Sequence, residues 1–333
     1  MENYGAPKAR TFELKPLLRG TSQVMFQPNA TTGVLFLIGI FWGAIASGHA
    51  EVAVGAIVGL VVSTLTGYIL SLPTEDGQVG LWGFNGILVG CAMMTFLGNT
   101  PLAWIALVLC SAMTTWVREG LNKVGAAHKV NSFTFPFVLC TWLFLAASRV
   151  LLGLDEVALS HPMLPAIHHY DLPAIAPSNL WEGIVWVLRG VGQIFLIDSW
   201  ITGLFFVVGL AISNPWSALW ALIGSAVGTY GALLYGASQV AVESGLYGFS
   251  PALTAIALGC TFYHPSWRSA LWALLGTIAT LFTQAAMNVF LEPLGLPALT
   301  APFCITTWLF LLPLLRLDGK KDADHTHWHK KTT

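Results

Sequence analysis

The chain has 333 residues, of which 55% are hydrophobic and 9% are charged, and its formal net charge is −1. A soluble domain carries about 25% charged residues, so the composition excludes an ordinary water-soluble surface. The near-zero net charge excludes the basic field that recruits nucleic acid. These properties predict an all-α polytopic membrane protein.

The first half of the chain begins with a polar segment, residues 1–18, which lacks an apolar core of signal-peptide length. A membrane-spanning helix needs about 20 apolar residues, and five segments qualify. We expect them at 30–49, at 52–72, on either side of the turn Gly98-Asn99-Thr100-Pro101 within 77–117, and at 130–148. The predicted first unit is therefore 19–152.

The second half repeats this count after a long connection, residues 153–188. Its apolar segments lie at about 199–213, 216–238, 244–262, 269–291 and 293–315. A polar tail, residues 317–333, follows the second unit at 189–316. The total is about ten transmembrane helices.

The orientation follows from the basic residues, because loops rich in Lys and Arg stay in the cytoplasm. An even number of spans places both termini on one side, and both termini are basic. The predicted loop after the fourth segment begins with Arg118 and falls on that same side. Residues 153–180 contain no Lys or Arg and fall on the other. Arg149 and Arg189 argue weakly against this arrangement. We expect both termini to be cytoplasmic.

Four sequence blocks recur in order, at offsets of 165 to 170 residues. The matched pairs are 19–26 with 189–196, 80–85 with 245–250, 134–137 with 300–303, and 142–145 with 308–311. Each copy has five spans, an odd number, so the second copy is inserted upside down. We therefore predict two inverted five-helix repeats with a transport site near mid-depth between them.

Matched aromatic and aliphatic residues are the first candidates for that site. Phe84 and Phe249 follow glycine-rich turns, and Leu88 and Leu253 lie one helical turn later on the same face. The glycines also permit a simpler interpretation, close helix packing. Occurrence at equivalent points of both copies favours an apolar slot along a transport path.

Two matched threonines, Thr134 and Thr300, are the next candidates. Each precedes a proline by two residues, and prolines in membrane segments predict broken or re-entrant helices around a central pore. A threonine hydroxyl bonded to its own helix is the alternative interpretation. Because the repeat pairs these residues, we expect them to meet at the midplane.

Gln23 and Gln193 lie just before the first span of each copy, and each is followed three residues later by an apolar side chain, Phe26 or Leu196. A single glutamine there is usually interfacial, whereas two at matched positions suggest the two mouths of a path. The five cysteines all lie in apolar runs and are interpreted as small hydrophobic residues. We find no catalytic triad, phosphate loop or metal-binding spacing, so we expect no enzymatic activity, no cofactor and no metal.

These blocks resemble the urea transporter family over nearly the whole chain. Residues 296–303 contain the family's complete Leu-Pro-x-x-Thr-x-Pro-Phe motif, and residues 80–85 match its Gly-Leu-aromatic-Gly-Phe-Asn element. The first copy lacks the Leu-Pro pair, and Ser250 replaces the expected Asn, which puts pore width and selectivity in question more than the fold.

The resemblance implies a homotrimer in the cell (inner) membrane, in the manner of a bacterial urea channel, with one pore in each protomer. It also implies the role of each candidate residue. Phe26, Phe84 and Leu88 would flank one end of the slot, and Leu196, Phe249 and Leu253 the other. Gln23 and Gln193 would contact substrate, with Thr134 and Thr300 at the constriction.

Passive, channel-like urea transport also fits the chemistry. Urea is small, planar and neutral, so a slot of aromatic and leucine faces admits it, and freed carbonyls replace its bonds to water. The same slot would serve another small neutral solute, such as a short amide or ammonia. An ion-coupled transporter would need ionisable residues near mid-span, which are nearly lacking, and a membrane enzyme would need clustered acids, bases or metal ligands.

Overall fold

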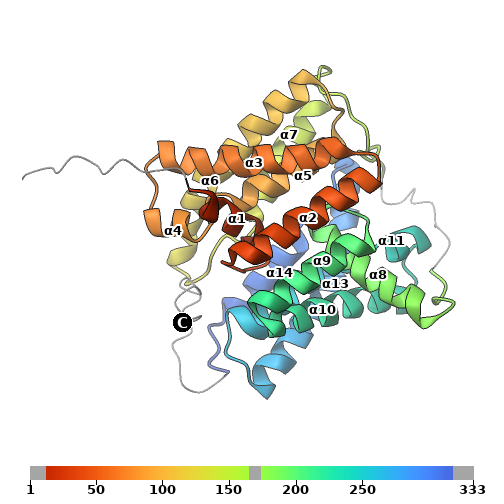
Figure 1. The fold of residues 1–333 in the computed structure, drawn as a ribbon. Coiled ribbons are helices and arrows are strands. Elements are labelled where there is room, and N and C mark those ends of the chain that lie inside the picture. Colours follow the sequence, from red (N-terminus) through yellow and green to blue (C-terminus); the bar gives the residue numbers. More distant parts are fainter. Residues whose placement is uncertain (1–12, 165–173, 318–333) are drawn as a thin grey trace, which may run out of the picture.

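The computed structural model describes residues 13–164 and 174–317 (Figure 1). Most of the predicted terminal segments, 1–18 and 317–333, lie outside the described residues. The first half contains α1 (Leu14–Gln23), α2 (Ala30–Ala46), α3 (Ala50–Ile69), α4 (Thr74–Gln78), α5 (Phe84–Phe96), α6 (Pro101–Ala126) and α7 (Phe135–Ser148). The second half contains α8 (Leu180–Gly192), η2 (Gln193–Phe195), α9 (Trp200–Ser213), α10 (Pro215–Leu234), α11 (Gln239–Glu243), α12 (Phe249–Ile256), η3 (Ala257–Thr261), α13 (Trp267–Leu291), η4 (Glu292–Leu294) and α14 (Ala301–Leu311).

The apolar helices fall into two length classes. Helices α3, α6, α10 and α13 (extended by η4) are long and apolar enough to cross a membrane. Helices α8 and α9 form a pair that is bent by 78° at the break between them. The other apolar helices, namely α2, α5, α7, α12 with η3, and α14, have 10–17 residues, and a helix of that length is shorter than the hydrocarbon core. The all-helical membrane protein is confirmed for the described residues, and the count of ten spans stays a prediction.

Two helices, α1 and α8, were not expected from the sequence. The boundaries predicted at 18/19 and 188/189 fall inside them. Both helices interrupt their apolar residues with charges, Lys15 and Arg19 in α1 and Glu182 and Arg189 in α8, so no apolar run of spanning length marks them.

Helix α6 continues to Ala126, well beyond the end predicted at residue 117. Arg118 is therefore helical, which corrects its assignment to a cytoplasmic loop. The apolar run ends where the charges begin, but the helix does not, because Glu119, Asn122 and Lys123 tolerate helical geometry.

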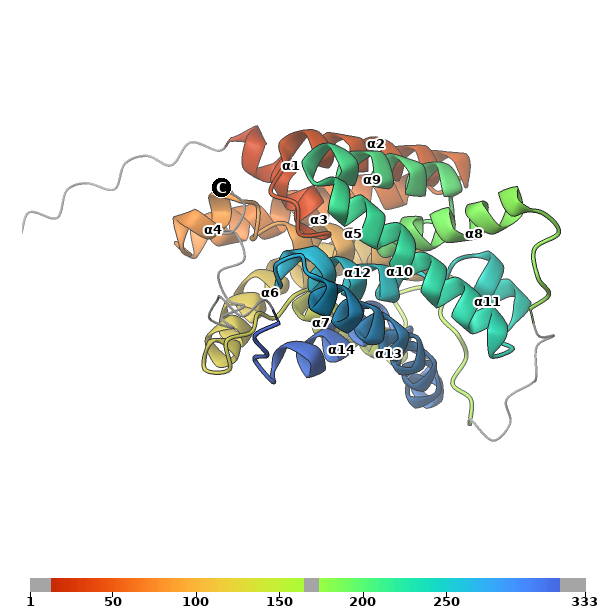
Figure 2. The ribbon, with the colours of Figure 1, turned by 90° about the horizontal axis from the view of Figure 1, so that it is seen from below.

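Helices α2 and α9 join the two halves and lie along each other in both views (Figures 1 and 2). The Thr32 hydroxyl of α2 donates to the Gly209 carbonyl, and the Thr202 hydroxyl of α9 donates to the Gly39 carbonyl, each at 2.8 Å. All four residues are buried. The contact is therefore reciprocal, with matched residues of the two halves exchanging donor and acceptor roles.

Glycines bring the helix that carries Phe84 against α3. A β-carbon at Gly59 of α3 would lie 2.0 Å from the Gly86 carbonyl oxygen of α5, and one at Gly90 would lie 2.0 Å from the Gly55 carbonyl oxygen. Since no side chain fits there, the two backbones are in direct contact. Helix α5 is thereby fixed along its length.

Two glycines with positive φ place the matched blocks 80–85 and 245–250 against α1 and α8, respectively. Gly80 has φ +88° and Gly245 has φ +77°. A β-carbon at either would lie 2.3 Å from a backbone nitrogen, that of Gly20 or Gly190 respectively. Conformation and space both require glycine here, and the contacts position Phe84 and Phe249 a few residues later.

Candidate functional site

Helices α7 and α14 begin at the same place in the molecule. Their N-cap residues are Thr134 and Thr300, whose hydroxyl oxygens are hydrogen-bonded to each other at 2.7 Å. Both residues are 2% exposed, and the Cys304 thiol lies 3.4 Å from the Thr134 hydroxyl. The structure thus brings the two predicted threonines together, and they bond to each other rather than to their own helices.

Prolines start these two helices instead of breaking them. Pro136 and Pro302 occupy the first turn of α7 and α14, where a missing N–H removes no helical hydrogen bond. In the predicted spans at 130–148 and 293–315, a non-helical stretch that ends at Thr134 or Thr300 is therefore followed by a short helix. Each helix directs its positive N-terminal end at the threonine pair.

Two tryptophans hold the non-helical segments that lead to the threonines. The Trp142 indole nitrogen donates to the Pro297 carbonyl, and the Trp308 indole nitrogen donates to the Asn131 carbonyl, each at 2.8 Å. These partners are again exchanged between matched positions of the two halves. Each half therefore positions the threonine of the other.

A cavity of about 140 Å³ reaches the threonine pair from one side. Its polar lining consists of Gln23, Asp76, Arg118, Asn122, Asn131, Ser132 and Thr134. Its apolar lining consists of Val24, Phe26, Leu81, Phe84, Phe133 and Phe262. Of the predicted site residues, the cavity brings together Gln23, Phe26, Phe84 and Thr134.

The matched glutamines are held by equivalent bonds. The Gln23 side-chain nitrogen donates to the Val79 carbonyl at 2.7 Å, and that of Gln193 donates to the Ser244 carbonyl at 2.9 Å. The Gln23 side-chain oxygen is buried and has no hydrogen-bond partner among the described residues. It is therefore an unmet acceptor within the wall of the cavity.

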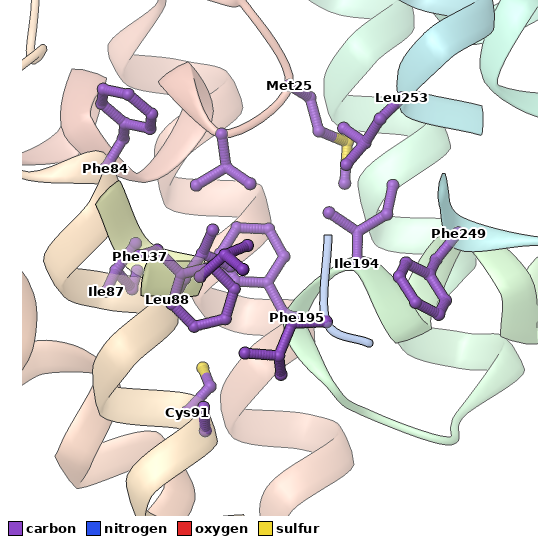
Figure 3. Packing of buried hydrophobic residues seen from close by; sticks show 14 of the residues in the cluster. Met25, Phe84, Ile87, Leu88, Cys91, Phe137, Ile194, Phe195, Phe249 and Leu253 are labelled. Atoms are coloured by element: carbon purple, nitrogen blue, oxygen red, sulfur yellow. The ribbon is translucent and has the colours of Figure 1, made fainter. Parts of the chain in front are cut away.

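The four residues of the predicted slot lie in one packed cluster, with Phe84 and Leu88 from α5 and Phe249 and Leu253 from α12 (Figure 3). Phe84 and Phe249 are 6% and 8% exposed, whereas both leucines are fully buried. Leu88 is not among the residues that line the cavity. The leucines are therefore more deeply buried than the phenylalanines.

Phe26 and Leu196 share an unusual backbone conformation. Their φ angles are 62° and 60°, in the left-handed region that non-glycine residues rarely adopt. Each N–H closes a turn onto the matched glutamine carbonyl, Gln23 at 3.0 Å and Gln193 at 2.9 Å. Strain of this kind gathers at functional sites.

An ion pair in the cavity wall is not predicted from the sequence. Both terminal nitrogens of Arg118 donate to one carboxylate oxygen of Asp76 at 3.0 Å, and the Arg118 side chain is only 7% exposed. The spacing of Arg118 and Asn122, one helical turn apart on one face, was the available signal. It required knowing that α6 continues past residue 117.

Asn85, the last residue of the first glycine-aromatic block, was also missed. Its side-chain oxygen accepts from the Phe137 backbone nitrogen at 3.1 Å, so α5 caps the start of α7. Ser250 occupies the matched position, and its buried hydroxyl has no hydrogen-bond partner among the described residues. The departure from the family motif therefore removes this cap from the second half.

Apolar helices of spanning length, with two short helices that meet at a buried polar pair, describe a helical integral membrane protein. A family model described as "Urea transporter" matches residues 14–314. The chain is 31% identical to urea transporter 1 of Ovis aries over 299 residues, which cover 89% of this chain and 76% of the relative. It is 32% identical to urea transporter 1 of Rattus norvegicus over 305 residues, with the same coverage. The chain belongs to the urea transporter family.

Proposed function

We propose that the chain is a passive, channel-like transporter of urea, which moves down its concentration gradient through a narrow path between the two halves. The observation that carries this proposal is the buried Thr134–Thr300 pair, where the starts of two short helices meet. Family membership supplies the substrate class, because the similar proteins are named as urea transporters.

Polar groups occur at intervals that suit a molecule with N–H donors and a carbonyl acceptor. Gln23 lines the cavity, and its buried side-chain oxygen has no hydrogen-bond partner among the described residues. Thr134 also lines the cavity, and its hydroxyl is paired with that of Thr300. A hydroxyl both donates and accepts, so the threonine pair can exchange its mutual bond for bonds to passing urea. Apolar faces lie on either side of the threonine pair, formed by Phe84 with Leu88 and by Phe249 with Leu253. These faces have no polar groups that could replace the hydration shell of an ion.

Electrostatics also favours a neutral solute over a cation. The N-terminal ends of α7 and α14 carry partial positive charge of about +0.5 each, and both point at the threonine pair. Arg118, a buried cation in the cavity wall, is paired with Asp76. Since urea carries no charge, its movement requires no coupled ion.

We propose further that the two halves are inverted repeats in which α5, α7, α12 and α14 are re-entrant or partial spans. The exchanged bonds of Thr32 with Gly209 and of Thr202 with Gly39 support this, since they relate the halves by matched positions. We retain the homotrimer, the inner membrane and the cytoplasmic termini as parts of the proposal. On this orientation the cavity opens to the cytoplasm, because the basic end of α6 lies beside it.

Stopped-flow light scattering on proteoliposomes tests the function. An inward urea gradient is applied with and without an imposed proton or sodium gradient. Fast urea entry that is indifferent to the ion gradients supports the proposal. Entry that quickens only with an ion gradient would indicate a coupled carrier, and no urea entry would make another small neutral solute the leading substrate.

A further inference from the structure

Four phenylalanine rings form a contact group at the inner end of the cavity, which we name the aromatic collar. Its members are Phe26, Phe133, Phe262 and Phe303. Five pairs of ring centroids lie 5.4 to 6.3 Å apart, within the range of direct aromatic contact. Three of the four rings line the cavity, the exception being Phe303. Phe133 and Phe262 have no role in the slot predicted from the sequence.

Phe133 directly precedes Thr134 and adopts φ 51°, in the left-handed region. Leu299 precedes Thr300 in the matched position and has φ 50°. The same left-handed backbone therefore carries a phenylalanine, which lines the cavity, in the first half and a leucine in the second. Phe133 also stacks on Trp308, with centroids 6.1 Å apart and planes inclined by 30°, which fixes its ring against the wall.

Phe262 follows a π-helical turn, η3 (Ala257–Thr261), in which its N–H bonds to the Ala257 carbonyl at 2.9 Å. The matched segment of α5 is regular α-helix. The repeat offset is 165 residues at Phe249 and 166 at Thr261, since Thr95-Phe96 matches Thr261-Phe262. One extra residue therefore lies between these points, and a π-turn is what one inserted residue produces in an α-helix.

Side chains of α10 and the loop after α1 hold the π-turn in place. Gly259 has no side chain where the Trp220 ring of α10 packs, since a β-carbon there would lie 2.4 Å from that ring. The Ser217 hydroxyl lies 3.3 Å from the Cys260 sulfur and accepts from Gln27 at 3.0 Å. The segment that carries Phe262 is thereby tied to the segment that carries Phe26.

We propose that Phe133 and Phe262 are specificity-determining residues. They narrow the urea path at its cavity end, in addition to the narrowing by the predicted slot residues. This inference rests on the proposed urea path. The positions matched to Phe26 and Phe133 are leucines, Leu196 and Leu299, so the aromatic collar, which both halves supply, is more aromatic than the group of residues matched to it. Ring faces carry partial negative charge and accept weakly from the N–H groups of a planar amide. A flat, thin solute passes such rings edge-on, and added methyl groups hinder it.

The test compares the fluxes of urea, N-methylurea and N,N′-dimethylurea in the same proteoliposomes. Phe262→Leu and Phe133→Leu are the test variants. Leucine keeps the site apolar, and Leu299 shows that it is accommodated at the backbone geometry of residue 133. Phe310→Leu is the matched control, because its ring packs on Trp272 and does not line the cavity.

We expect each test variant to raise the methylurea-to-urea flux ratio about two- to twelvefold, the effect of losing one aromatic pair, and the control to leave it unchanged. Size-exclusion profiles and retained urea flux establish that a variant is folded, and one folded test variant is enough for the test. If that variant carries urea with an unchanged methylurea-to-urea flux ratio, the proposed role of Phe133 and Phe262 is wrong, while the proposed urea transport stands. No urea flux through the wild-type protein overturns the proposed function and this inference with it.

Discussion

Replacing Thr300 by valine tests whether the threonine pair lies on the path. Valine has nearly the shape of threonine, so the change removes a hydroxyl and little else. In the wild-type protein, the Thr134–Thr300 bond, which measures 2.7 Å, is replaced by two bonds between urea and the hydroxyls, a net gain of one bond. In the variant, urea gains one bond and displaces the contact of Thr134 with the Cys304 thiol, which measures 3.4 Å. The net loss is therefore at most about one hydrogen bond, or about 0.5–1.5 kcal/mol, which corresponds to a flux reduced by no more than about two- to twelvefold.

The same change leaves Thr134 without its strongest partner. An unmet buried hydroxyl costs about 1–3 kcal/mol, but the Cys304 thiol lies 3.4 Å away and offers a weak substitute. We therefore expect the free energy of unfolding to fall by an amount near the lower end of this range, about 1 kcal/mol, with a correspondingly small fall in Tm. Flux must accordingly be measured per mole of folded protein.

Stopped-flow light scattering gives the flux, and thermal unfolding in detergent gives the Tm. Thr300→Ser is the control, because it keeps the hydroxyl and should keep the flux. In a double-mutant cycle, Thr134→Val combined with Thr300→Val should be less damaging to stability than the sum of the single changes, since the two residues share one bond. A Thr300→Val flux equal to that of the wild-type protein, at equal amounts of folded protein, would refute the position of the threonines on the path.

Three further outcomes are expected. Phe84→Ala should widen the slot, so that N,N′-dimethylurea enters at a rate approaching that of urea, and a variant that still rejects it in the light-scattering assay would contradict the slot. Asp76→Asn should remove the charge that faces buried Arg118 and lower the unfolding free energy by about 1.5–3 kcal/mol, seen as a lower Tm, and an unchanged Tm would show that the pair adds no stability. Gly80→Ala should place a β-carbon 2.3 Å from a backbone nitrogen and lower the Tm by the equivalent of about 1–3 kcal/mol. Gly120→Ala, which meets nothing within 4 Å, should not lower it, and equal effects of the two would argue against the close contact.

The sequence predicts the long helices and the pairing of residues better than it predicts helix ends. Segments such as 52–72 are continuous apolar runs, so α3 follows directly from hydropathy. The meeting of the two threonines is predicted from the sequence repeat, on the expectation that equivalent residues of two inverted copies lie near a shared axis. Neither inference needs a side-chain position.

Helix ends and polar contacts between segments escape hydropathy. Arg118 was placed in a loop because the apolar run stops before it, and its partner Asp76 lies 42 residues away. The π-turn that carries Phe262 requires comparing the offsets of the two copies residue by residue. Ring contacts such as that of Phe133 with Phe262 depend on packing that no local pattern encodes.

The exchanged bonds between the halves have a consequence for how the protein is made. The ribosome delivers the first half to the membrane while Thr32 and Trp142 still await Gly209 and Pro297, their carbonyl partners in the second half. Without the second half these donors lack the carbonyl partners that they have in the complete fold, and lipid does not replace them. We therefore expect the two halves to close on each other late, as one step, and the two halves expressed as separate chains to associate in the bilayer.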